Sequence, residues 1–224
     1  SRIIERPKVV YNALTKKFVM WMHIDKEDYS YARAGVAVSD QPQGPYVFLR
    51  SERPNGNMSR DMTVFKDDDG KAYHVFSSEE NATMHICLLS DDYTAHTAFE
   101  KRIFIIQSRE APAMFKHNGK YFLITSGCTG WSPNAATWAI SKSPLDDWKQ
   151  VGNPCNGADS ALTFTSQSTF VLPIAGKPGS FIFMADRWNK TNLEDSRYVW
   201  LPLTFKKQVP LIEWYAEWGM ELLK

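Results

Sequence analysis

The stretch Ser108-Arg109-Glu110-Ala111-Pro112-Ala113-Met114-Phe115 indicates how this chain folds. A carboxylate precedes a short apolar run, and Asn118-Gly119 then supplies a hairpin turn before the aromatic-rich run 121–125. The same order of a polar residue, an apolar strand, a turn and a second strand occurs four times along the chain. The repeat therefore carries more information than any single copy of it.

The four copies begin at Glu5, Asp61, Glu110 and Gln167, which are 56, 49 and 57 residues apart. Each start is followed by short apolar stretches bounded by turn residues, the pattern of β-strands. A period near 50 with about four strands per unit is typical of β-propeller blades. We expect an all-β β-propeller with about four blades, forming a single domain over residues 1–224. A two-sheet sandwich would explain the strands but not the period.

The composition excludes several kinds of partner. Basic and acidic residues number 26 and 25, so a net charge of +1 gives no electrostatic reason to expect nucleic acid. Runs of about 18 apolar residues are absent, and we expect no membrane partner. The five histidines lack paired metal-ligand spacing. They are interpreted as structural, and no catalytic metal is predicted.

Equivalent residues of successive blades converge on one axis in a propeller. Three acids and one amide would then form a polar ring, although each could instead serve only to tie a strand end to backbone amides. Carboxylates that face one another shift each other's pKa, so that one stays protonated while another is ionised. Cleavage of a glycosidic bond requires such a pair.

Loops after the second strands offer candidate sugar contacts. Trp131 is placed to stack on a sugar ring and Thr129 to supply a hydroxyl, while Tyr29 lies in the matching loop of the first unit. Asp186 and Arg187 end the equivalent strand of the fourth unit, and Arg187 is expected to neutralise or orient the acids. Packing is the alternative role for a loop tryptophan.

Five segments together resemble glycoside hydrolase family 43, and within it the exo-β-1,3-galactanases: Glu5-Arg6-Pro7-Lys8-Val9, Ser59-Arg60-Asp61-Met62-Thr63, Ser108-Arg109-Glu110-Ala111-Pro112, Thr125-Ser126-Gly127-Cys128-Thr129-Gly130-Trp131 and Ser166-Gln167-Ser168-Thr169. The resemblance implies a five-bladed propeller enzyme that releases terminal galactose from β-1,3-galactan, the arabinogalactan backbone, with inversion. It also implies an oligo- or polysaccharide substrate and a secreted or periplasmic location. The resemblance implies no required cofactor, and it leaves open whether a structural calcium ion is bound.

The resemblance also assigns roles to four residues. Glu110 is the general acid, Asp61 orients it and modulates its pKa, and Glu5 holds the terminal galactose. Gln167 stands where most of the family has an aspartate base. It acts either as a base through an imidic-acid tautomer or only by positioning water.

The resemblance leaves one structural question and three functional alternatives. The family has a further N-terminal blade ahead of Glu5, so we expect a fragment, a reduced propeller, or a second chain or homo-oligomer that completes the ring. The alternatives are another family 43 glycosidase (arabinofuranosidase, xylosidase or galactofuranosidase), a non-catalytic carbohydrate-binding propeller, and a kelch-like protein-interaction propeller.

Overall fold

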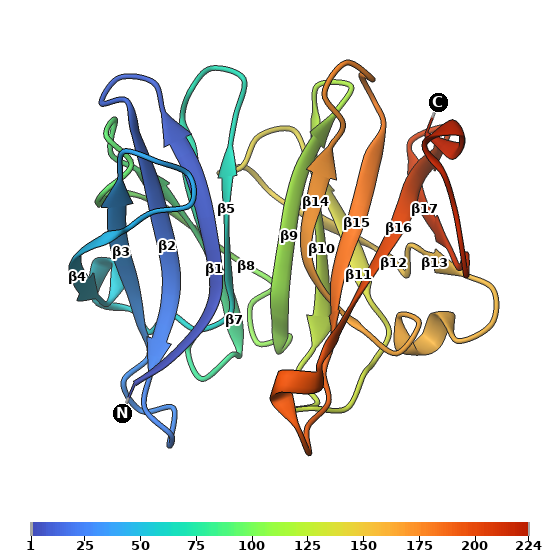
Figure 1. Ribbon diagram of the computed structural model, residues 1–224, viewed down its shortest axis with the longest axis horizontal. Helices are drawn as coiled ribbons and strands as arrows, with labels where there is room; N and C mark the ends of the chain where they lie inside the picture. The colour runs from blue at the N-terminus through green and yellow to red at the C-terminus, as the bar shows by residue number, and fades with distance from the viewer. Residues whose placement is uncertain (1, 224) are drawn as a thin grey trace. The chain divides into compact units, whose positions relative to one another are not determined.

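The computed structural model describes residues 2–223, and its regular elements there are β-strands and single-turn 3₁₀ helices (Figure 1). The first eight strands are β1 (Ile3–Asn12), β2 (Lys17–Asp25), β3 (Arg33–Ser39), β4 (Val47–Glu52), β5 (Met62–Lys66), β6 (Ala72–Ser78), β7 (Thr83–Leu89) and β8 (His96–Ile103). The others are β9 (Arg109–His117), β10 (Lys120–Gly127), β11 (Thr137–Ser141), β12 (Lys149–Gly152), β13 (Cys155–Asn156), β14 (Gln167–Pro173), β15 (Phe181–Arg187), β16 (Arg197–Lys206) and β17 (Val209–Glu213). The 3₁₀ helices are η1 (Pro54–Gly56), η2 (Ser160–Leu162), η3 (Leu193–Asp195) and η4 (Met220–Leu222).

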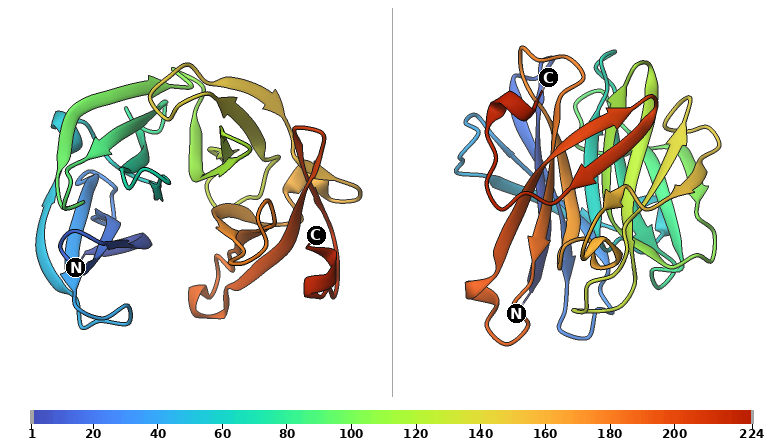
Figure 2. Two further views of the ribbon diagram at one scale, coloured as in Figure 1. Left: turned by 90° about the horizontal axis from the view of Figure 1, so that it is seen from above. Right: turned by 90° about the vertical axis from the view of Figure 1, so that its right-hand side faces the viewer.

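These strands form four sheets. The sheet orders are β1-β2-β3-β4, β5-β6-β7-β8, β12-β11-β10-β9 and β13-β17-β16-β15-β14, and Figure 2 shows the first sheet in blue and most of the last in orange to red. The chain divides into two compact units. Unit 1 runs to Glu110 and includes Pro144–Asp146, and unit 2 holds Ala111–Ser143 and the residues from Asp147 on.

Unit 1 contains the first two sheets, and their cores are shared. Trp21 of β2 and Phe76 of β6 are fully buried members of one cluster, and the Trp21 indole donates to the carbonyl of Tyr93 at 2.8 Å. The strands β1 and β5, each the first of its sheet, lie side by side (Figure 1). All of β6 is buried, whereas the outer strand β4 is half-buried to exposed.

Unit 2 has its own core of aromatic and branched side chains. Phe122 and Trp138 from one sheet pack with Phe183 and Leu201 from the other. The hairpin turn predicted at Asn118-Gly119 is present, and both residues have positive φ (48° and 70°), as a tight two-residue hairpin turn needs.

One strand departs from the expected four per sheet. Cys155–Asn156 forms β13, which pairs in parallel with β17 and gives the last sheet a fifth strand. Elsewhere the predicted all-β repeat is confirmed. Among residues 2–223, no helix has the length and apolar character to cross a membrane.

Candidate active site

The four repeat-starting residues occupy equivalent places in their sheets. Glu5 lies near the start of β1, Asp61 directly precedes β5, Glu110 is the second residue of β9, and Gln167 opens β14. Each of these strands is the first, in chain order, of the paired run β1–β4, β5–β8, β9–β12 or β14–β17. The structure therefore brings the predicted positions to the same end of the same strand in each repeat.

The backbone is irregular beside three of these residues. In β1, Glu5 pairs with His23 and Lys8 with Trp21, so Arg6 and Pro7 form a β-bulge, with Arg6 at φ 53°. Ala111 follows Glu110 with the same φ of 53°, again between a glutamate and a proline. In β14 the register shifts between Ser168 and Phe170, directly after Gln167. Bulges and left-handed residues re-aim the side chains next to them and are frequent at active sites.

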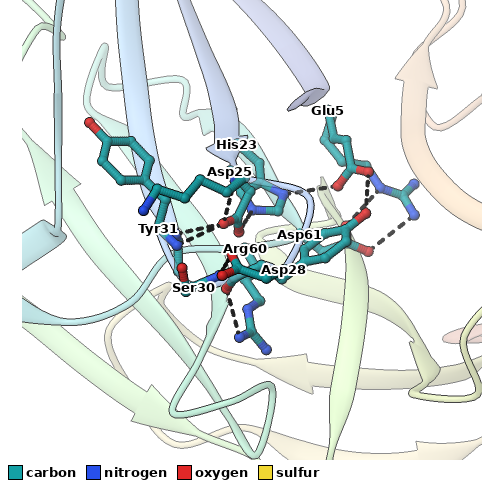
Figure 3. A network of polar contacts seen from close by, with 12 residues as sticks. Glu5, His23, Asp25, Asp28, Ser30, Tyr31, Arg60 and Asp61 are labelled. Carbon is teal, nitrogen blue, oxygen red and sulfur yellow. Dashed lines mark hydrogen bonds and ion pairs between the residues drawn. The ribbon is translucent and has the colours of Figure 1, made fainter. Parts of the chain in front are cut away.

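Glu5 of unit 1 is held by two side chains (Figure 3). The Tyr29 hydroxyl donates to Oε1 at 2.8 Å, and His23 Nδ1 lies 3.0 Å from Oε2. Burial, followed by the hydrogen bond to Glu5, raises the pKa of Tyr29, which keeps its hydroxyl proton for donation. A carboxylate with two fixed contacts still has acceptor capacity for sugar hydroxyls.

Asp61 forms a bidentate ion pair within unit 1. Arg6 Nε lies 3.2 Å from one carboxylate oxygen and Nη2 3.1 Å from the other. The side chains are 5% and 16% exposed, so the pair is largely shielded from water. Parallel N–H···O bonds of this kind fix the plane of a carboxylate as well as its position.

Glu110, in unit 1, is half-buried. Asn81 Nδ2 makes a long contact of 3.5 Å to Oε2, and the Ser77 hydroxyl donates to the neighbouring carbonyl of Arg109 at 3.0 Å. Sequence reasoning gave neither Ser77 nor Asn81 a role of its own. Ser77 lies near the end of β6, the second strand of the second repeat, and Asn81 follows that strand, where the loops of the other repeats also carry candidates.

Glu5, His23 and Asp61 also bring one possible ligand atom each within 4.8 Å of one another. Each atom already has a partner in the molecule, because Glu5 contacts Tyr29 and His23 while Asp61 faces Arg6. A cation placed here would approach the Arg6 guanidinium. The three side chains are therefore already paired within the protein, which disfavours a cation at this place.

In unit 2, Gln167 is held by uncharged partners, in contrast to the charged contacts of Glu5 and Asp61 in unit 1. The Trp188 indole donates to Gln167 Oε1 at 3.2 Å, and Gln167 Nε2 donates to the Ser126 hydroxyl at 2.9 Å. Trp188 meets Trp131 edge to face at 5.7 Å. Together with Asp186, which pairs opposite Gln167 in the sheet, Gln167 and the two tryptophans line a small cavity. Sequence reasoning assigned no role to Ser126 or Trp188.

Two predicted contacts lie elsewhere in unit 2. Thr129 accepts from Asn134 at 2.7 Å and donates to the Ser132 carbonyl, so it shapes the loop that presents Trp131. Arg187 donates to the carbonyls of Phe164 and Thr165 and lies over the Trp214 ring. The guanidinium thus braces a loop beside a second cavity of about 550 Å³. Among the residues of unit 2 up to position 223, it contacts no carboxylate.

Repeated antiparallel sheets with one polar residue at the start of each first strand define a β-propeller protein. The chain belongs to glycoside hydrolase family 43: the profile of the glycosyl hydrolases family 43 matches residues 10–171.

Solved structures agree with this membership. A family 43 β-1,3-galactosidase, solved with galactodeoxynojirimycin, is 46% identical, with 97% of this chain and 77% of that chain covered and a TM-score of 0.94. An exo-β-1,3-galactanase from Clostridium thermocellum is 42% identical, with 95% of this chain and 48% of that chain covered and a TM-score of 0.87. The predicted propeller fold is confirmed by these matches.

A curated relative matches over a shorter segment. Xylosidase/arabinosidase 43A from Humicola insolens is 52% identical over 44 residues, which are 20% of this chain and 13% of that protein. The matched segment is thus a small part of that protein's length.

Proposed function

We propose that this chain is an exo-acting glycoside hydrolase that releases terminal galactose from β-1,3-galactan with inversion of configuration. The likeness of nearly the whole chain to a β-1,3-galactosidase carries the proposal. The acids at the starts of β1, β5 and β9 supply the chemistry that such a reaction needs.

Glu110 is the proton donor in this proposal. It gives its proton to the glycosidic oxygen as the bond to the anomeric carbon breaks, while water attacks the opposite face of the sugar. The released galactose is then the α-anomer. Glu5 and Tyr29 bind hydroxyls of the terminal sugar, and Asp61, fixed by Arg6, orients the acid. The attacking water releases one proton to bulk water, and Glu110 takes one up from bulk water before the next cycle, so no cofactor is required.

Gln167 orients the attacking water in this proposal. Its amide plane is fixed from both ends, because Trp188 donates to the carbonyl oxygen and Ser126 accepts from the amide nitrogen. An amide oxygen accepts a hydrogen bond from water but is a very poor base. In the imidic-acid alternative, the nitrogen keeps one N–H and takes up a proton from the attacking water, while the proton on the oxygen leaves.

The test is hydrolysis of β-1,3-galactotriose by the purified chain. Galactose release is measured by chromatography and the first-formed anomer by proton NMR. Glu110→Gln should reduce kcat by about 10²- to 10⁴-fold because it removes the proton donor. Glu217→Gln, which changes an exposed glutamate outside the site, should leave kcat unchanged. Unreduced release by Glu110→Gln, or β-galactose as first product, would overturn the proposal.

The match to a xylosidase/arabinosidase favours a second candidate activity, on xylosides or arabinofuranosides. Nitrophenyl β-galactoside, β-xyloside and α-arabinofuranoside assayed side by side distinguish the candidates by kcat/KM. Tight binding of galactotriose without turnover would identify a non-catalytic carbohydrate-binding propeller.

The proposed substrate also implies a location and an assembly. A galactan polymer does not enter cells, so we propose that the chain acts as a secreted or periplasmic protein, which cell fractionation tests. A second chain or copy that completes the propeller stays a prediction. Light scattering of the purified protein measures its oligomeric state and so tests this prediction.

A further inference from the structure

His23 of unit 1 lies between two carboxylates (Figure 3). Its Nδ1 is 3.0 Å from Glu5 Oε2 and its Nε2 is 2.7 Å from Asp25 Oδ2. The imidazole is 1% exposed, and Asp25 is fully buried. Both ring nitrogens are therefore committed to carboxylate oxygens in a place that water barely reaches.

The backbone fixes Asp25 at the far end of this chain of contacts. Its Oδ1 accepts the amide N–H groups of Lys26, Tyr31 and Ala32 at 2.9, 2.9 and 3.0 Å. Three amide donors and one imidazole leave the carboxylate no alternative orientation. Burial acts to raise the pKa of Asp25, but the hydrogen bonds from Ala32, His23 and Lys26 overcome it and lower the pKa.

The geometry also fixes the protonation of the ring. An imidazole with a single proton would turn one bare nitrogen toward carboxylate lone pairs, and only imidazolium donates on both sides. Burial acts to lower the pKa of His23, but hydrogen bonds to Glu5 and Asp25, with the charges of Glu5 and Asp61, raise it overall. Arg6 is the second cation of the group, and Tyr29 stays neutral.

We propose that Asp25 and His23 are positioning residues that hold Glu5 in the orientation that binds the terminal sugar. The proposal rests on the proposed function, in which Glu5 is the sugar-binding carboxylate. His23 fixes Oε2 and Tyr29 fixes Oε1, so the remaining acceptor sites of Glu5 face in set directions toward a pair of neighbouring sugar hydroxyls. Asp25 supplies the rigidity, because its own position depends on backbone amides.

The expected signature is a change in KM with little change in kcat. As pH rises above the pKa of His23 in the folded protein, the ring loses a proton and releases one of its two carboxylates. KM for galactotriose should then rise while kcat, which depends on Glu110, follows its own pH dependence.

Asp25→Asn tests the proposal with little disturbance. The asparagine oxygen can keep the three amide N–H bonds, and its NH₂ group then faces His23 Nε2, which must become an acceptor. The ring keeps one proton, on Nδ1, and a neutral imidazole then donates to the Glu5 carboxylate. We expect KM to rise about tenfold with kcat nearly unchanged, since the ion pair between imidazolium and carboxylate becomes a hydrogen bond from an uncharged donor.

His96→Gln is the matched control. His96 is also a buried histidine of unit 1 with partners on both nitrogens, His74 at 2.9 Å and Glu52 at 2.8 Å, but it makes no contact with Glu5. This variant should lower thermal stability and leave KM and its pH dependence unchanged.

Nitrogen-15 NMR of the histidine rings separates this proposal from the proposed function. Wild-type His23 should show two protonated nitrogens at pH 6, and Asp25→Asn should show one. A single protonated nitrogen in the wild type, or an unchanged KM in Asp25→Asn, would overturn the positioning role. If the wild type releases no galactose although its NMR signals are as expected, the proposed function fails, and the dissociation constant for galactose replaces KM as the test of the role.

Discussion

The candidate residues of the two units are fixed by opposite means. In unit 1, Glu5 and Asp61 are held by ionised or ionisable partners, His23 and Arg6, in largely buried contacts. In unit 2, Gln167 is held by an indole and a hydroxyl, neither of which carries charge. Charged contacts are strong when shielded but depend on pH and on both partners, whereas neutral contacts are weaker and insensitive to pH. The following substitutions test this difference.

Removing one charge from unit 1 should have the largest effect on stability. Asp61→Asn breaks the bidentate pair and leaves the buried Arg6 guanidinium without its carboxylate. The free energy of unfolding should fall by about 3 kcal/mol, measured by urea denaturation. Asp40→Asn, in the exposed pair with Lys17, is the control and should change it by less than about 0.5 kcal/mol. Equal losses of stability in the two variants would show that burial of the ion pair between Arg6 and Asp61 does not increase its contribution to the free energy of unfolding.

Unit 1 should also unfold first in acid. His74 is fully buried against His96, and burial together with His96 lowers its pKa well below the usual value; burial lowers that of His96 too. Below pH 6.5 these two histidines bind protons in the unfolded chain but not in the folded protein. The free energy of unfolding therefore falls as pH falls. The slope approaches about 1.4 kcal/mol per pH unit for each such proton.

The contribution of His23 to stability depends on pH in the opposite direction. Its raised pKa stabilises the fold below pH 6.5, and that stabilisation is lost as pH rises through the pKa of His23 in the folded protein. Hydrogen exchange between pH 6.5 and 5 should show β6 and β7 losing protection before β15 and β16. His74→Phe should reduce that difference, since a phenyl ring fits between Trp21 and Phe76 and takes up no proton. Earlier exchange in unit 2 would contradict the prediction.

The neutral contacts of unit 2 should give a smaller effect that does not depend on pH. Trp188→Phe keeps the ring against Trp131 but removes the N–H donated to Gln167. A lost neutral hydrogen bond of about 1 kcal/mol corresponds to a fall in kcat of about fivefold, which initial rates on galactotriose measure. The shape of the pH–rate profile should stay that of the wild type. A shifted profile would mean that Gln167 takes part in proton transfer.

The sequence was sufficient to locate the four strand starts but not the partners of the residues there. Counting back from the β1–β2 turn, where Asn12 pairs with Lys17, places Ile24 opposite Glu5. The bulge at Arg6 and Pro7 shifts the register by one residue and puts His23 there instead. Periodicity cannot reveal such a shift, although the Glu-x-Pro sequence shared by residues 5–7 and 110–112 is a usable signal, since proline in a strand favours bulges.

Other parts of the structure could not be predicted from the sequence, for different reasons. The strand β13 has two residues and pairs only through the distant β17, so no local pattern marks it. Ser126 and Trp188 contact Gln167 from positions 41 and 21 residues away along the chain. Arg187 was expected to neutralise or orient the acids because of its charge, and that role stays a prediction. Its N–H groups donate to the carbonyls of Phe164 and Thr165 in a loop of left-handed residues, which the sequence did not indicate.

The smallest expected difference concerns surface ion pairs in the two units. Glu79 of unit 1 pairs with Arg102 through both oxygens and also contacts His85, and Arg102 is the main cause that lowers the pKa of Glu79 to about 2. Asp195 of unit 2 forms a single pair with Arg197, and both of these side chains are at least half exposed. Glu79→Gln should therefore cost more than Asp195→Asn, although by less than about 1 kcal/mol at pH 7, because solvent screens both pairs. The Glu79 contribution is present above pH 4.5 and is lost as pH falls toward 2, so the two variants should become equal in stability near pH 2. Urea titrations of both variants at pH 7 and in acid measure this convergence, and a Glu79 effect that persists at the acid end would show that its role is packing rather than charge.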